Sequence, residues 1–123
     1  GGLKDVGALL AGLAAASLGR DATVAVESFG VTRVFSVPRG PFGTIAAADP
    51  DTVPDILLRD LRMSRISTVT LGAEDAPTLT LTRAGEGLAI TLECASHHLT
   101  ATEAVSLLSN FAGRMEQPLR HLL

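Results

Sequence analysis

The polar cluster Ser96-His97-His98 contains the residue types in this sequence that best suit acid–base chemistry. It lies between an apolar run that ends at Cys94 and a helical pattern that begins near Thr100. A junction between a strand and a helix holds side chains rigidly, and histidine titrates near neutral pH, so His97 or His98 would suit a general base. The cluster is also typical of a polar turn that only faces water, and this is the favoured interpretation for a bare pair of histidines.

Other reactive side chains are better explained by structural roles. Cys94 precedes His97 by three residues, which would allow a thiol–imidazole pair, but its alternation with Leu92 favours a buried, inert thiol. Glu103 follows Thr100 at the spacing of a helix capping box. Glu27 lies within a strand pattern, where a charged side chain usually faces solvent.

Composition excludes several classes of protein. The chain has 123 residues, 46% of them hydrophobic and 19% charged, which predicts one folded domain over 1–123. One cysteine excludes a disulfide framework and a cysteine-based zinc site, and no carboxylate lies at a spacing that would join His97 and His98 in another metal site. A net charge of −3 with 3% aromatic residues argues against nucleic-acid binding.

The N-terminal apolar stretch raises the question of a targeting segment. The run 8–18 is too short to span a bilayer and is interrupted by Gly12, while Asp5 spoils a positively charged leader. Helical spacing explains the stretch better, so we expect no membrane association and a cytoplasmic protein. Lys4 is the only lysine and lies outside any lipoylation or P-loop motif, which excludes a covalently bound lipoyl arm.

Periodicity and turn residues predict a helix first, strands in the middle and a helix last. The first helix is expected over 3–18, with Gly19 as its cap and one apolar stripe, and 56–63 is expected to form one or two helical turns. The expected strands are 22–28, 31–37, 44–48, 66–71, 78–83 and 88–94, with loops over 38–43 and 49–55.

Each expected helix has one apolar stripe. The stripe of the first helix comprises Leu3, Val6, Leu10, Leu13 and Ser17. The stripe of the last helix comprises Ala104, Leu107, Leu108, Phe111 and Met115, before Pro118 closes or restarts that helix. In the 78–83 strand, Thr78, Thr80 and Thr82 are expected to line the outer face.

Several motifs together resemble a known family. The strand 88–94, the motif region 96–103, the ending Glu116-Gln117-Pro118 and the close Leu122-Leu123 resemble the C-terminal end of the dihydrolipoamide acyltransferase core of 2-oxo acid dehydrogenase complexes. That core belongs to the chloramphenicol acetyltransferase-like superfamily. Upstream, 23–30 is similar to the family's Thr-Phe-Thr-Ile-Ser-Asn-Leu-Gly strand, and 70–73 to its Leu-Gly-x-Gly turn. The resemblance implies an α/β (α+β) domain, a mixed β-sheet flanked by helices, as a truncated chloramphenicol acetyltransferase-like fold.

The resemblance also assigns roles to particular residues. His97 falls at the family's general base, while Ala101 replaces the second Asp of its Asp-His-Arg-x-x-Asp-Gly motif and Thr102 replaces the Gly. The Ser that steadies the oxyanion falls on Glu27, with Ser28 next to it as a weaker candidate. A carboxylate at an oxyanion site would repel the developing charge. A frame shifted by one makes His98 the second His of a condensation-domain-like motif, but Thr102 then stands where an Asp is needed.

Two functions follow as expectations. The first is a non-catalytic pseudoenzyme that forms homotrimers, as the family's cores do, and organises a larger acyltransferase assembly. The alternative is one half of a split acyltransferase, in which a partner chain supplies the missing N-terminal half of the core. His97 would then act on a thioester of coenzyme A or of a carrier protein. Whether the chain is an enzyme, and which acyl group it would transfer, stays open at this point.

Overall fold

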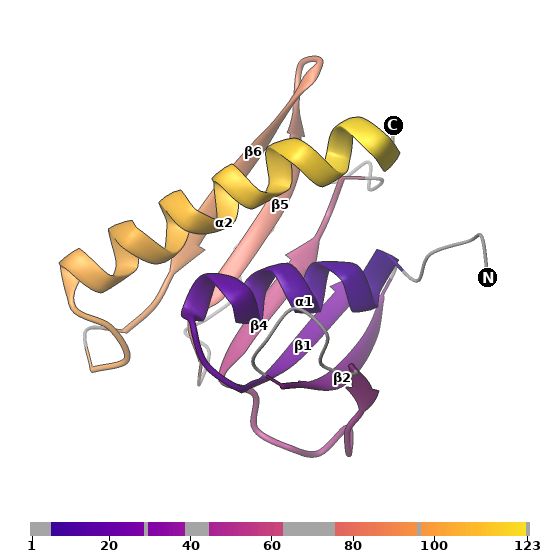
Figure 1. The fold of residues 1–123 in the computed structure, drawn as a ribbon, viewed down its shortest axis with the longest axis vertical. Coiled ribbons are helices and arrows are strands. Elements are labelled where there is room, and N and C mark those ends of the chain that lie inside the picture. Colours follow the sequence, from indigo (N-terminus) through magenta and orange to yellow (C-terminus); the bar gives the residue numbers. More distant parts are fainter. Residues whose placement is uncertain (1–5, 29, 39–44, 63–75, 96, 123) are drawn as a thin grey trace.

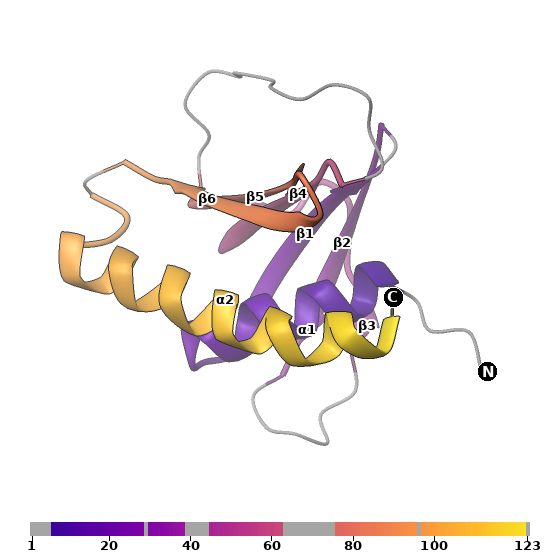
Figure 2. The same cartoon turned by 90° about the horizontal axis from the view of Figure 1, so that it is seen from above.

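Six strands form one mixed sheet, and two helices cover one of its faces (Figures 1 and 2). The computed structural model describes residues 6–28, 30–38, 45–62, 76–95 and 97–122. The elements in chain order are α1 (Val6–Leu18), β1 (Ala22–Ser28), β2 (Val31–Val37), β3 (Ala46–Ala47), β4 (Ile56–Asp60), β5 (Thr78–Ala84), β6 (Gly87–Glu93) and α2 (Ala101–Leu122). The predicted fold class is confirmed: an α+β arrangement with a mixed sheet, whose helices both lie on the same side.

The sheet has parallel pairs at its centre and antiparallel pairs outside them. Its order is β3-β2-β1-β4-β5-β6, in which β1–β4 and β4–β5 are parallel and β1–β2 and β5–β6 are antiparallel. Gly30, with φ 76°, and Gly85, with φ 60°, lie in the turns of the two antiparallel hairpins, where a residue without a Cβ adopts that conformation at low cost. The strands expected over 22–28, 31–37, 44–48, 78–83 and 88–94 are confirmed to within a few residues.

The segment 56–63 forms the central strand β4 instead of the expected helical turns. Strand pairing decides this, because β4 lies between β1 and β5 and pairs with both. Two hydrogen bonds join β1 to the residue just before β4. The N–H of Thr23 donates to the carboxylate of Asp55 at 2.8 Å, and the N–H of Asp55 donates to the carbonyl of Thr23 at 2.8 Å. A run of five residues contains too little periodicity to distinguish a buried strand from a helical turn.

The buried face of α1 overlaps the expected stripe at Leu10 and Ser17 but is centred on alanines. Leu10, Ala11, Ala14, Ala15 and Ser17 are buried, whereas Val6 is 38% exposed and Leu13 only half-buried. Small alanine side chains let the helix lie close to the sheet, and a search for large apolar residues overlooks such a face. The end of α1 agrees with the sequence: Gly19 has a φ of 77°, and its N–H donates to the carbonyl of Ala15 at 3.0 Å.

The helix α2 packs through the predicted stripe. Leu107, Phe111 and Met115 are buried, and Leu108 packs partly buried against the same cluster. The helix runs without a break from Ala101 to Leu122, so the expectation that Pro118 closes or restarts it is wrong. A proline removes a single backbone donor, and the helix can continue where neighbouring bonds remain.

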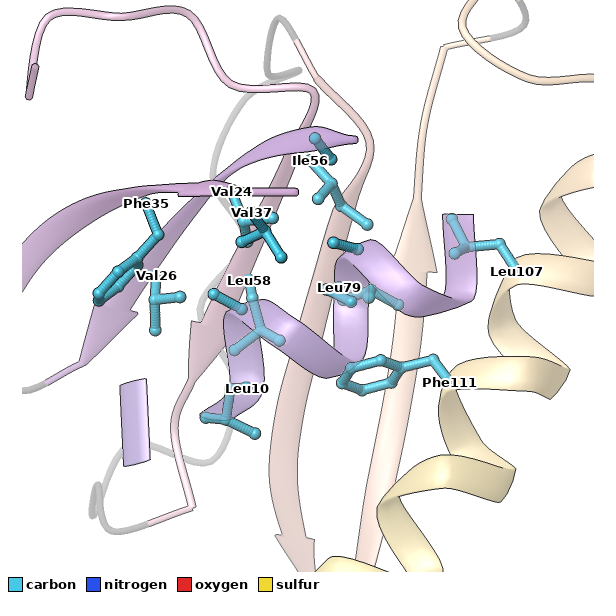
Figure 3. Close-up of a cluster of buried hydrophobic side chains, with 14 of the residues drawn as sticks. Leu10, Val24, Val26, Phe35, Val37, Ile56, Leu58, Leu79, Leu107 and Phe111 are labelled. Atoms are coloured by element: carbon cyan, nitrogen blue, oxygen red, sulfur yellow. The ribbon is translucent and has the colours of Figure 1, made fainter. Parts of the chain in front are cut away.

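One apolar core lies between the sheet and the two helices (Figure 3). Leu10 from α1, Phe111 from α2 and Leu58 and Leu79 from the central strands meet there. Thr78 is buried and Thr80 and Thr82 are half-buried, so the expected row of solvent-facing threonines is only partly exposed. The strand expected over 66–71 lies outside the described residues, as does most of the loop over 38–43.

Truncating Phe111 tests the core. Phe111 is fully buried between α2 and the sheet, so Phe111→Ala should lower the free energy of unfolding by about 3–5 kcal/mol. Val105→Ala, at a position 69% exposed on the same helix, should change it by less than about 0.5 kcal/mol. Urea denaturation followed by circular dichroism measures both, and equal effects of the two substitutions would contradict this packing.

Candidate functional site

The two histidines lie in the loop that joins β6 to α2. The N–H of His98 donates to the carbonyl of Ala95 at 2.9 Å, which closes a turn before the helix. The rings of His97 and His98 are in contact, with centroids 4.3 Å apart and planes tilted by 59°. His97 is exposed, whereas His98 is half-buried. In the part of the chain that the structure describes, Nδ1 of His98 is the only buried side-chain polar atom without a hydrogen-bond partner.

The capping box fixes this loop to the start of α2. The N–H of Glu103 donates to Oγ1 of Thr100 at 3.1 Å, and the N–H of Thr100 donates to Oε1 of Glu103 at 2.9 Å. Hydrogen bonds from the backbone and then from the side chain of Thr100 hold the pKa of the Glu103 carboxyl below its ordinary value of 4.5. Leu99 packs partly buried against the core on the other side of the loop. The predicted capping box is confirmed, and it explains Glu103 without a catalytic role.

Cys94 is exposed, so the prediction of a buried, inert thiol is wrong. The strand β6 ends at Glu93, and the alternation that buries one face of a strand does not extend beyond its end. Leu88, Ile90 and Leu92 do pack against the core, as their spacing predicts.

Ser28 and His97 lie at opposite ends of the sheet. Ser28 pairs with Asp60 at the carboxyl end of β1 and β4, and Asp60 pairs in turn with Leu81 of β5. The strand β6 runs the other way: Glu93, just before the histidine loop, pairs with Thr78 at the amino end of β5. Within one chain, the structure therefore does not bring these two candidate residues together (Figure 1).

Glu27 forms an ion pair with Arg59 across the central strands. The two residues are neighbours in the parallel register of β1 and β4, and Nε of Arg59 lies 3.3 Å from Oε2 of Glu27. The Glu27 side chain is 32% exposed and that of Arg59 only 10%, so Glu27 is half-buried instead of simply facing solvent. The pair lies on the sheet face away from the helices, because Val26 and Leu58, the residues just before, belong to the core between the layers.

A second ion pair closes the carboxyl end of β4. Arg62 donates to both carboxylate oxygens of Asp60, from Nε at 2.8 Å and from Nη2 at 2.9 Å. These hydrogen bonds raise the pKa of the Arg62 guanidinium above its ordinary value. Sequence reasoning missed both pairs; the available signal was the run of charges that directly follows the apolar residues 56–58.

Among the described residues, no three of His, Cys, Asp and Glu lie close enough to hold a metal ion. His121 lies in the last turn of α2, about 30 Å along the helix from its start near His97. In the described part of the chain, neither helix has the length and apolar character needed to cross a bilayer.

The fold and the loop define the chain as an α+β protein with a paired-histidine turn between an edge strand and a capped helix. Comparison with family models, with curated proteins and with solved structures finds no match.

The capping box should make stability depend on pH in the acid range. Because the pKa of Glu103 is lower in the folded state than in the unfolded one, its contribution is present above the unfolded value and disappears as pH falls through the folded value. Urea denaturation from about pH 7 to about pH 2 should therefore give the native chain a higher free energy of unfolding than Glu103→Gln. This stability advantage should shrink as the pH falls below 4.5. An advantage that stays constant over this range would contradict the assignment.

Proposed function

We propose that this protein is a non-catalytic, trimer-forming cytoplasmic subunit with a truncated acyltransferase-like fold that organises a larger acyltransferase assembly. The observation that carries the proposal is the ion pair between Arg59 and Glu27, the residue at the position of the family's oxyanion donor, with Nε and Oε2 3.3 Å apart. Ser28 and His97 of one chain lie at opposite ends of the sheet, so a base and an oxyanion donor within reach of the same reacting atoms would have to come from different chains.

The substitutions in the family's motif support the same proposal. Glu27 stands at the position of the family's oxyanion donor. Its Oε2 lies 3.3 Å from Nε of Arg59, so the carboxylate takes part in an ion pair within the sheet. Ala101, at the position of the second Asp, is exposed in the first turn of α2 and offers no polar group. Loss of an oxyanion donor alone typically lowers a rate by about 100- to 1000-fold.

The outer face of α1 supports association between copies. No residue of α1 is charged, although the sheet and α2 cover only one side of the helix. Val6 and Ala16 are exposed and Leu9 is half-buried, and their spacing places them on one face. An uncharged helix surface of this kind is typical of a helix that another protein surface covers.

The split acyltransferase is the second candidate, and the exposure of His97 favours it. An exposed imidazole in a loop that a capping box holds in place is accessible to a thiol on a partner chain. In this arrangement the partner would contribute the oxyanion donor and the surface for coenzyme A or a carrier-protein thioester. His98, in ring contact with His97, would orient it.

The mass in solution tests the association. The proposal expects a trimer, three times the 12.7 kDa of one chain, by light scattering at micromolar concentration. Ala16→Glu, at the exposed face of α1, should dissociate it because like charges would meet in a buried contact. Ser109→Glu, on the exposed face of α2, is the matched control and should leave the mass unchanged. A monomeric native chain would contradict the proposed trimer.

Removal of the imidazole of His97 separates the two functions. For a non-catalytic subunit, the transfer of acetyl groups from acetyl-CoA to dihydrolipoamide should stay at the background rate in the native chain and in His97→Ala. If the native assembly transfers acetyl groups and His97→Ala loses about 100-fold or more, while His98→Ala loses less, the split acyltransferase is correct. Circular dichroism of both variants verifies folding.

A further inference from the structure

The strand β6 forms an open edge of the sheet that lacks the usual protection. In the described part of the chain, β6 pairs with β5 on one side only. Residues 87–92 contain no charge and no proline, although edge strands usually carry such residues to prevent further pairing. The opposite edge is different, because its last strand, Ala46–Ala47, is only two residues long. A seven-residue edge with free backbone groups can therefore accept another strand.

An apolar groove runs beside this edge, between β6 and α2. It has a volume of about 430 Å³ and is lined by Leu88, Ile90, Ala112, Gly113, Met115 and Glu116. Leu88 and Ile90 are only half-buried, so their side chains retain surface that an added strand could cover. Figures 1 and 2 show that the first turns of α2 reach past β6, over the space that an added strand would occupy.

The charges around the edge are acidic. Glu86 precedes β6, Glu93 ends it, and Glu116 lines the groove from α2; all three are exposed. Two cations lie nearby: Arg83 on β5, opposite Leu88 and thus one strand in from the edge, and Arg114 on α2, exposed between Gly113 and Met115. A segment with basic residues at its two ends would complement these carboxylates at both ends of the strand.

We propose that β6 binds an extended, basic-flanked segment of a partner protein, which adds a seventh strand to the sheet beside the groove between β6 and α2. Backbone hydrogen bonds to β6 would supply affinity, and alternate apolar side chains would enter the groove beside Leu88, Ile90 and Met115. The flanking basic residues would set the position of the segment. This surface lies outside the proposed trimer contact on α1, so the inference stands independently of the proposed function.

A second copy of β6 would be a poorer occupant. If two copies of this strand paired antiparallel about Ile90, Glu93 of each copy would lie opposite Gly87 of the other and next to its Glu86. Two-fold symmetry would bring these carboxylates together at both ends of the contact. The overhanging helices would also meet above the strands, whereas a single extended segment needs no helix of its own.

Fluorescence anisotropy with a labelled peptide tests the proposal. The probe is a seven-residue peptide of alternating valine and threonine with a lysine at each end. The full chain should bind it saturably, and should bind the same peptide with glutamate ends about tenfold more weakly. Equal affinity for the two peptides, or no saturation by the lysine peptide, would overturn the proposal.

Two substitutions at Gly113 form the matched pair of variants. A Cβ at Gly113 would meet no atom within 4 Å, so both Gly113→Ala and Gly113→Phe should fold, and each removes a helix-destabilising glycine. Gly113→Phe should fill the groove and weaken binding about tenfold, whereas Gly113→Ala should bind like the native chain. Equal binding by both variants would exclude the groove as the site.

Charge reversal gives a second, independent measurement. Glu116→Lys should weaken binding of the lysine-ended peptide and strengthen that of the glutamate-ended one, because only the sign of the groove's charge changes. Light scattering should show the same mass for this variant as for the native chain, since α1 is untouched. An unchanged preference between the two peptides would contradict the role assigned to the acidic rim.

Discussion

Burial of the inner face of the central strands beneath two helices is the constraint on which the other features depend. Val24 and Val26, Ile56 and Leu58, and Leu79 and Leu81 each alternate along a strand and face the same layer. A sheet with such a face needs an apolar cover, and α1 and α2 provide it from one side only. Polar and charged groups are consequently confined to the strand ends and to the other face.

This constraint explains the placement of the charged pairs. Arg59 directly follows Leu58, so its side chain points away from the helices, where Glu27 in the next strand neutralises it at 3.3 Å. Asp60 and Arg62 pair where the strand ends. A buried guanidinium without a partner would be costly, so the Glu27–Arg59 pair favours the parallel register in which these two residues are neighbours.

The strand order also places Ser28 and His97, the two candidate catalytic residues, at opposite ends of the sheet. Because β6 returns antiparallel to β5, the histidine loop must lie at the amino end of the central strands, while Ser28 lies at their carboxyl end. What remains accessible are surfaces: an uncharged helix face on α1 and an unprotected strand edge at β6. The proposed association between copies and the proposed strand binding would use these two surfaces.

The sequence by itself determined the helix caps, the outer hairpins and the α2 stripe, because each depends on neighbouring residues. Thr100 and Glu103 close the capping box within four positions, and the spacing of Leu107, Phe111 and Met115 alone defines a helix face. Only the tertiary structure decided that 56–60 is a central strand, that α1 packs through alanines, and that Cys94 is exposed. These outcomes depend on which segments, distant in sequence, pair or pack together, and local patterns do not contain that information.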